Sequence, residues 1–160
     1  MYSAILALHS WLRWLALVAG VLATFFAGRD TPSLSAGSGG APAKSLADRL
    51  GMILVSTLDL QLLLGLALYF FVSPNMAEIR ANFDAAMKDP ATRFWAVEHI
   101  TMMLGAVIAA HVGRVLARKT ADANSRRMKL FICYGIATIL MVLAIPWPGM
   151  RAGRPLFRGF

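Results

Sequence analysis

The stretch Leu50–Val72 reads LGMILVSTLDLQLLLGLALYFFV, and Asp59 is its only charged side chain. A helix needs about 20 consecutive apolar residues to cross a bilayer, and this stretch meets that length. Three other stretches have the same character: Ala4–Ala27, Phe94–Ala117 and Leu130–Ile145. The sequence therefore predicts an all-α integral membrane protein, a four-helix up-down bundle that forms a single domain over residues 1–160.

The composition agrees with this prediction. Hydrophobic residues make up 58% of the chain and charged residues 15%, with a mean hydropathy of +0.63. Soluble domains are about half apolar and about a quarter charged. Basic loops account for the net charge of +8, so no nucleic-acid partner is expected. The single cysteine, Cys133, excludes a disulfide framework and is expected to be a small buried apolar residue.

Basic residues in the loops predict the orientation in the membrane. The first span has no Lys or Arg before its apolar run, so we expect a permanent helix and not a cleaved signal peptide. The cytoplasmic side of a membrane protein carries the excess of Lys and Arg. Nine basic residues belong to the loops after the first and third spans: Arg29, Lys44, Arg49, Arg114, Arg118, Lys119, Arg126, Arg127 and Lys129. The other side has six: Arg80, Lys88, Arg93, Arg151, Arg154 and Arg158. Both termini are therefore predicted to be periplasmic, in a bacterial inner membrane.

Residues 75–89, between the second and third spans, have the pattern of a short amphipathic helix. Apolar side chains recur at helical spacing: Met76, Ile79, Phe83 and Met87. Asn75 is expected to cap this helix, and Thr92 to cap the third span. We expect the helix to lie in the membrane interface, with its apolar side in lipid or over the mouth of the bundle.

Polar side chains inside the spans mark candidate functional positions, because they are costly in hydrocarbon unless paired. There are seven: His9, Arg13, Asp59, Gln61, Glu98, His99 and His111. All except His111 fall in the half of the bundle near the termini. We expect Arg13 to pair with Asp59 or Glu98. A polar interior on one side of the membrane is what a cofactor or quinone pocket requires.

His9 and His99 lie at similar depths in the first and third spans. In an up-down bundle these helices are parallel and diagonal, so the two imidazoles are predicted to face each other across a haem b as axial ligands. The alternative is that each histidine hydrogen-bonds a neighbouring helix. Ser10, Glu98 or a backbone carbonyl one turn back would accept a hydrogen bond from a ligating imidazole, and Arg13 is a further supporting residue. His111 lies twelve residues after His99, about 18 Å along the helix, and is predicted to be an interface residue near Arg114.

The expected surroundings of a haem are less specific. Small positions where a ring edge could approach are Gly20, Gly65 and Gly105. Partners for propionates are Arg13, Arg80 and Arg93. Aromatic wall candidates are Trp11, Trp14, Tyr69, Phe70, Phe71, Phe94 and Trp95. Copper held by His99 with Met102 or Met103 is a weaker alternative. There is no hydrolytic or transferase motif, so an enzymatic role stays open only as electron transfer.

Five runs carry a resemblance to a known family: His9–Trp14, Asp59–Phe70, Met87–Pro90, Glu98–Met103 and Ile145–Pro148. They resemble small four-helix bacterial membrane proteins, mostly uncharacterised, of which some are labelled cytochrome b-like. The resemblance implies a haem and ligands on parallel diagonal helices, with one usable histidine pair where cytochrome b has two.

Two functions follow as expectations. One is a redox subunit with one haem b near the periplasmic side, passing electrons between quinol and a partner. The other is a non-catalytic accessory subunit of a larger respiratory or photosynthetic membrane complex. In the second case residues 75–89 and the basic tail Arg151–Phe160 would contact neighbouring subunits.

Overall fold

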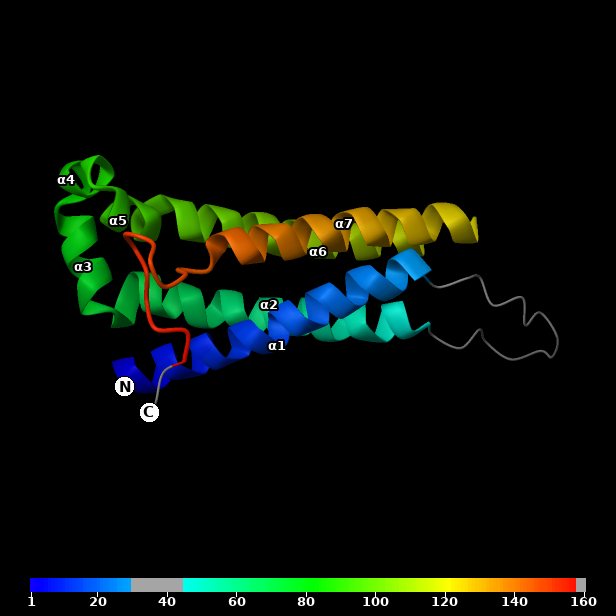
Figure 1. Ribbon diagram of the computed structural model, residues 1–160, viewed down its shortest axis with the longest axis horizontal. Coiled ribbons are helices and arrows are strands. Elements are labelled where there is room, and N and C mark those ends of the chain that lie inside the picture. The colour runs from blue at the N-terminus through cyan, green and yellow to red at the C-terminus, as the bar shows by residue number, and fades with distance from the viewer. Residues whose placement is uncertain (30–44, 158–160) are drawn as a thin grey trace.

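The computed structural model describes residues 1–29 and 45–157, and within these ranges the chain is helical and contains no strand. The long helices are α1 (Tyr2–Arg29), α2 (Leu46–Ala67), α6 (His99–Arg118) and α7 (Ala123–Ala144) (Figure 1). A π-helical segment, η1 (Leu68–Val72), extends α2. The short helix α5 (Pro90–Arg93) and a second π-helical segment, η2 (Phe94–Glu98), precede α6.

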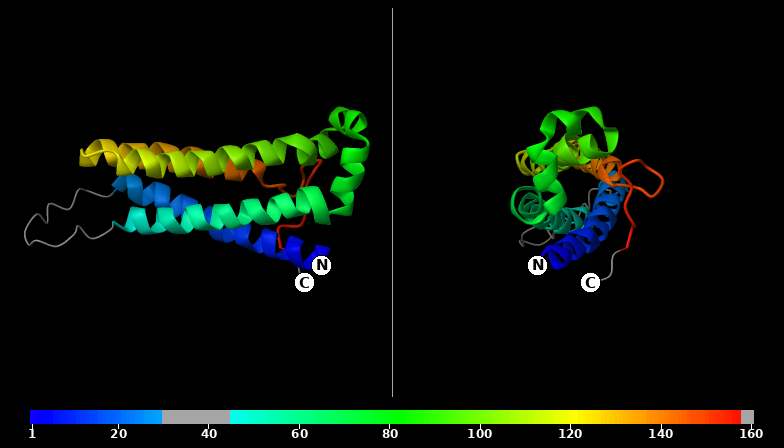
Figure 2. Two further views of the ribbon diagram at one scale, coloured as in Figure 1. Left: turned by 180° about the vertical axis from the view of Figure 1, so that it is seen from behind. Right: turned by 90° about the vertical axis from the view of Figure 1, so that its left-hand side faces the viewer.

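Four helical segments are long and apolar enough to cross a membrane: Tyr2–Arg29, Leu46–Val72, Pro90–Arg118 and Ala123–Ala144. The predicted all-α four-helix bundle of a multi-pass membrane protein is therefore confirmed. Helix α1 packs against α2 and α7, and α6 packs against the same two helices (Figure 2). As expected for an up-down bundle, α1 and α6 lie diagonally across the core.

The fourth helix starts seven residues earlier than the predicted Leu130. Asp122 caps it by accepting a hydrogen bond from the backbone N–H of Ser125 at 2.7 Å. Arg126, in its first turns, donates to both carboxylate oxygens of Asp48 at 2.7 and 2.8 Å. This ion pair joins the starts of α2 and α7. The charged residues before Leu130, which interrupt the apolar pattern of the sequence, therefore belong to α7.

The predicted single helix over 75–89 is wrong in detail. Two helices, α3 (Pro74–Ala81) and α4 (Phe83–Lys88), are separated by Asn82, whose backbone is not helical. Ser73, not Asn75, caps α3, and Asp89, not Thr92, caps the helix that leads into the third span. Both caps sit just before a proline at the first helical position, where the missing N–H costs nothing.

The apolar side of this segment covers the mouth of the bundle, which is one of the two predicted positions. Met76, Ile79 and Ala86 are buried and form one cluster with Ala96. Figure 1 shows α3 and α4 across the end of the bundle where both termini lie, which we call the terminus end. The opposite end, between α1 and α2 and between α6 and α7, is the loop end.

The core is close-packed away from the terminus end. Small side chains let the helices approach: Ala16, Ala19, Ala23, Ala27, Ala106, Ala110, Ala117 and Ala137 are buried. Tyr134 lies so close to Gly51 that a Cβ there would meet its hydroxyl oxygen at 2.1 Å. Cys133 is only partly buried, so its prediction as a buried residue is wrong. It packs against Gly113. Toward the terminus end α1 diverges from α7 (Figure 1), and the space between them is the site described next.

Candidate functional site

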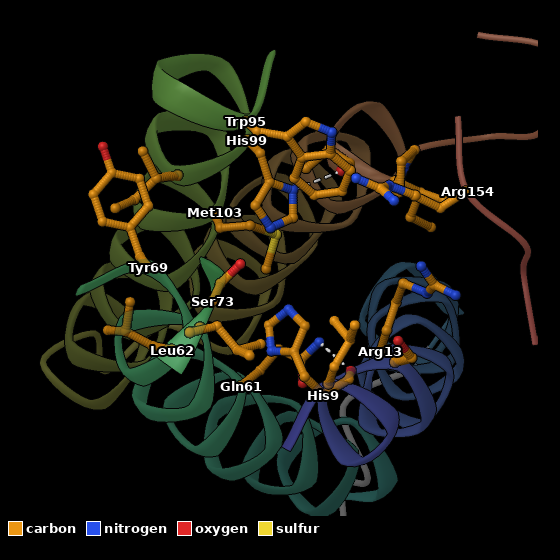
Figure 3. A pocket seen from close by; sticks show the side chains of 18 of the residues that line it. His9, Arg13, Gln61, Leu62, Tyr69, Ser73, Trp95, His99, Met103 and Arg154 are labelled. Atoms are coloured by element: carbon orange, nitrogen blue, oxygen red, sulfur yellow. Dashed lines mark hydrogen bonds between the residues drawn. The ribbon is translucent and has the colours of Figure 1, made fainter. Parts of the chain in front are cut away.

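A cavity lies between the four spans at the terminus end. About 160 Å³ of it is open to the centre of a water molecule, against about 10–15 Å³ needed for one water. Figure 3 shows side chains from the first three spans and from the C-terminal segment around it, and Met141 of the fourth span also lines it. Its polar and aromatic lining includes His9, Ser10, Arg13, Gln61, Tyr69, Ser73, Trp95, His99 and Arg154. The cavity is thus larger than a single buried water requires, and polar groups are set among a mostly apolar lining.

His9 and His99 lie on opposite walls of the cavity. Their ring centroids are 6.4 Å apart and their ring planes are inclined by 66°. In Figure 3 a ring nitrogen of each histidine is directed toward the other ring. The two residues that the sequence placed at similar depth are therefore brought together from diagonal helices.

Hydrogen bonds fix how His99 faces the cavity. Its Nδ1 donates to the carbonyl oxygen of Ala144 at 2.8 Å. Because a carbonyl only accepts, Nδ1 carries the proton of the neutral ring and Nε2 keeps its lone pair. The rings of Phe94 and Trp95 pack at 5.9 and 5.5 Å from the His99 ring. His99 therefore presents a ligand atom in a fixed direction.

His9 is held through its backbone and by a glycine. Gln61 Nε2 donates to the His9 carbonyl oxygen at 2.8 Å. A Cβ at Gly65 would lie 3.3 Å from His9 Cε1, closer than an ordinary contact, so the glycine lets the ring rest directly against α2. Within the described part of the chain, His9 Nδ1 and Gln61 Oε1 are buried with no hydrogen-bond partner. Of these two atoms, Nδ1 of His9 can donate or accept a hydrogen bond, depending on where the ring carries its proton, and Oε1 of Gln61 can only accept one.

The π-helical segment η2 positions the third span. The N–H of His99 bonds the carbonyl oxygen of Phe94, five residues earlier, in place of the usual four. Such a bulge turns the residues that follow relative to those before it, and π-bulges are frequent at functional sites. It lies directly before His99, and η1 carries Tyr69 into the same cavity. Neither η1 nor η2 can be recognised from the spacing of apolar residues in the sequence.

The predicted partner of Arg13 is wrong. Arg13 Nη2 donates to the carbonyl oxygen of Leu156 at 2.7 Å, and Trp14 Nε1 reaches the same oxygen at 3.3 Å. Phe157 stacks on Trp14, with ring centroids 5.5 Å apart. The basic tail therefore folds back over its own chain as far as residue 157, where a free docking surface was expected.

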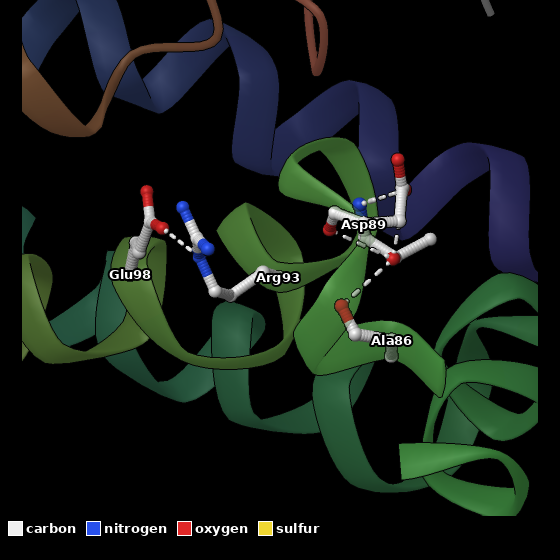
Figure 4. A network of polar contacts seen from close by, with 5 residues as sticks. Ala86, Asp89, Arg93 and Glu98 are labelled. Atoms are coloured by element: carbon white, nitrogen blue, oxygen red, sulfur yellow. Dashed lines mark hydrogen bonds and ion pairs between the residues drawn. The ribbon is translucent and has the colours of Figure 1, made fainter. Parts of the chain in front are cut away.

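The two carboxylates expected near Arg13 are engaged elsewhere. Glu98 accepts from Arg93 Nε at 2.8 Å, and both side chains are more than 40% exposed (Figure 4). Glu98 is the residue before His99 and so points about 100° away from it around the helix. It does not line the cavity, which contradicts its expected supporting role beside His99.

Asp59 and His111 form a pair of their own. Asp59 Oδ1 accepts from His111 Nε2 at 2.8 Å. His111 therefore has a partner, Asp59, that the sequence did not indicate. Because α2 and α6 are antiparallel, a residue twelve positions beyond His99 meets the middle of α2.

Only some of the residues expected to surround a haem line the cavity. Arg80 donates to the carbonyl oxygens of Tyr69 and Phe70 at the end of η1, and neither Arg80 nor Arg93 lines the cavity. Of the aromatic candidates only Tyr69 and Trp95 line it, and of the glycines only Gly65 does. Gly20 and Gly105 face side chains of α7 instead.

Arg154 lines the cavity although the sequence did not indicate it as a site residue. Its guanidinium carbon lies 5.6 Å from the centre of a Trp95 ring, at the mouth of the cavity. The turn after α7 carries it there: Pro146 and Pro148 end the helix, and Gly149 adopts a φ of 94° that favours glycine. These two prolines and the glycine are the feature of the sequence that indicates a reversal of the chain after the fourth span.

The donor set limits the chemistry of the site. The described residues contain no group of three or more His, Cys, Asp or Glu side chains that could hold a bare metal ion. Two opposed imidazoles match a metal whose other ligands belong to a cofactor. Searches against family models, curated proteins and solved structures found no match to this chain.

Proposed function

We propose that this protein binds one haem b between His9 and His99 and acts as a b-type cytochrome-like redox subunit of a bacterial inner membrane. The distance between the two imidazole rings supports the proposal most directly. Two metal–nitrogen bonds of about 2 Å, with about 1.1 Å from each nitrogen to its ring centre, require ring centroids about 6.2 Å apart. The measured separation is 6.4 Å.

The walls of the cavity fit a flat, largely apolar cofactor with two acidic groups. Tyr69, Trp95 and Met103 supply apolar surface beside the histidines. Arg13 and Arg154 lie at the mouth, where they can bind carboxylates. The unpartnered His9 Nδ1 is the second ring nitrogen that a ligating imidazole normally directs to a hydrogen-bond acceptor, and Gln61 Oε1 is an unused acceptor in the same wall.

When bound, haem iron supplies one-electron transfer at a potential set by its axial ligands and burial. The chain's own residues hold and orient the group. His99 is fixed by Ala144, His9 by Gln61 and Gly65, and the tail closes the mouth through Arg13. The proposal includes periplasmic termini, which place the haem near the periplasmic side, and quinol as one electron partner.

The absorption spectrum of the purified full-length protein tests the proposal. We expect a low-spin, six-coordinate b-type spectrum, which His9→Ala or His99→Ala abolishes. The matched control is His111→Ala, which removes an imidazole from the same helix but outside the cavity and leaves the spectrum intact. Failure of the protein to take up haem, with correct folding shown by helicity, would overturn the proposal.

The second candidate is an accessory subunit of a larger respiratory or photosynthetic complex. Exposed aromatic side chains near the terminus end favour it: Phe70 is 50%, Phe71 86% and Phe83 45% exposed. Aromatic residues are enriched at protein interfaces and equally at the membrane interface. Co-purification of other subunits with a haem-free protein would favour this candidate over the first.

A further inference from the structure

Asp59 and His111 form a hydrogen-bonded pair on the outside of the bundle, within two of the four apolar spans. Asp59 is the midpoint of the span Leu46–Val72, and His111, seven residues before the end of the span Pro90–Arg118, meets it at 2.8 Å. Each side chain is 47% exposed. The pair is therefore on the outer surface of the spans and not in the core.

Such a position is unfavourable in a single copy of the chain. Ionisable side chains in the hydrocarbon region normally face a bundle interior or a water-filled cavity. Here the flanking side chains are apolar and face outward, with Leu63 65% and Ile108 61% exposed. Across the described residues, the second carboxylate oxygen of Asp59 and Nδ1 of His111 have no hydrogen-bond partner. The pair therefore retains unused polar atoms that lipid cannot satisfy.

We propose that a second copy of this chain packs on the seam between α2 and α6, related by a two-fold axis that passes near this pair. A two-fold interface brings each surface patch against itself, so a self-complementary patch is required. The pair meets this requirement: each copy has one carboxylate oxygen of Asp59 and Nδ1 of His111 left over, and the two-fold axis sets the His111 Nδ1 of one copy against the Asp59 oxygen of the other. With a proton on that Nδ1, two copies form a closed ring of four hydrogen-bonded side chains.

The packing of the bundle agrees with a partner at this seam. The contact between α2 and α6 is the least extensive of the four contacts between neighbouring spans, so the seam is open to side chains from outside. Polar side chains promote helix association in membranes because lipid offers no alternative partner. The exposed faces of α1 and α7, such as Val18 and Ile139, present apolar side chains on the other side of the bundle. The proposal does not depend on haem binding.

The oligomeric state of the full-length protein in lipid nanodiscs or mild detergent tests this inference, by native mass spectrometry. We expect a dimer for the parent chain. The double variant Asp59→Leu/His111→Leu removes both polar side chains together, so neither is left without its partner, and we expect the dimer association constant to fall by about tenfold or more. Its helicity should match that of the parent, which separates lost association from misfolding.

Cross-linking locates the interface. In a Cys133→Ala background, a cysteine at Leu63 or Ile108 should form a disulfide-linked dimer in membranes, whereas the control Ile139→Cys, of similar exposure, should not. A monomeric parent chain would overturn the proposal. So would a dimer that cross-links through Ile139, or a different protein bound at the Asp59–His111 seam.

Discussion

His99 donates a hydrogen bond to the carbonyl oxygen of Ala144, the last residue of α7. This oxygen is free because the helix stops there. In a continuing helix it would accept from the N–H of residue 148, and that residue is Pro148, which has none. The proline cluster after α7 thus leaves unpaired the acceptor that orients His99. The place where α7 ends therefore determines how the His99 ring of α6 is oriented.

Restoring the missing donor should weaken the site. Pro146→Ala/Pro148→Ala lets α7 continue, so that the Ala144 oxygen is used within the helix. We expect haem affinity to fall by about 10–100-fold, as for the loss of other hydrogen bonds that orient metal-bound histidines. Titration of the haem-free protein with haem measures it. Pro146→Ala alone is the control, because position 148 still lacks an N–H. Equal affinities of the double variant and the control would contradict the role of Ala144.

Substitution of Gly65 should separate haem affinity from stability. A Cβ at this position lies 3.3 Å from His9 Cε1, so Gly65→Ala displaces the ring slightly and Gly65→Leu fills its place. Alanine in a helix interior stabilises by about 0.5–1 kcal/mol relative to glycine. We therefore expect Gly65→Ala to raise thermal stability in the haem-free state and to lower haem affinity, and Gly65→Leu to abolish binding.

Gly135→Ala is the matched control for this prediction. The nearest atom to a Cβ there is Thr24 Cγ2 at 3.7 Å, an ordinary contact, so stability should rise with no change in haem affinity. An unchanged affinity in Gly65→Leu would show that His9 does not need its present position to bind a cofactor.

The spans and the histidine pair could be predicted because each depends on a regular feature of sequence. Apolar length identifies the spans, and equal depth on parallel helices brings His9 and His99 together. The partners of Arg13 and Glu98 could not be predicted in this way. The partner of Arg13 is a backbone carbonyl of the tail, and the partner of Glu98 depends on the side of the helix that η2 presents. The pairing of Asp59 with His111 depends in turn on the register between α2 and α6. Nothing local in the sequence specifies these.

Arg13 should control the position of the tail. Its hydrogen bond to the Leu156 carbonyl involves a charged donor, and such bonds contribute about 1.5–3 kcal/mol. In Arg13→Leu we therefore expect the tail to open about tenfold more often or more. Faster tryptic cleavage after Arg151 reports the opening. Arg29→Leu, which removes a guanidinium 4.8 Å from the ring of Phe25 at the loop end, should leave the cleavage rate unchanged. Equal rates in the parent and in Arg13→Leu would mean that this bond does not hold the tail.

The orientation of the bundle decides which side of the membrane the cavity opens to. By sequence, nine basic residues belong to the loops after the first and third spans and six to the other loop and the tail, which predicts a cytoplasmic loop end and periplasmic termini. Single cysteines in a Cys133→Ala background test this with a membrane-impermeant maleimide on intact spheroplasts. We expect Met150→Cys, on the exposed turn after α7, to be labelled directly. Asn124→Cys, at the start of α7, should be labelled only after permeabilisation. The reverse pattern would place the cavity on the cytoplasmic side, so that any electron partner at the terminus end would have to be cytoplasmic.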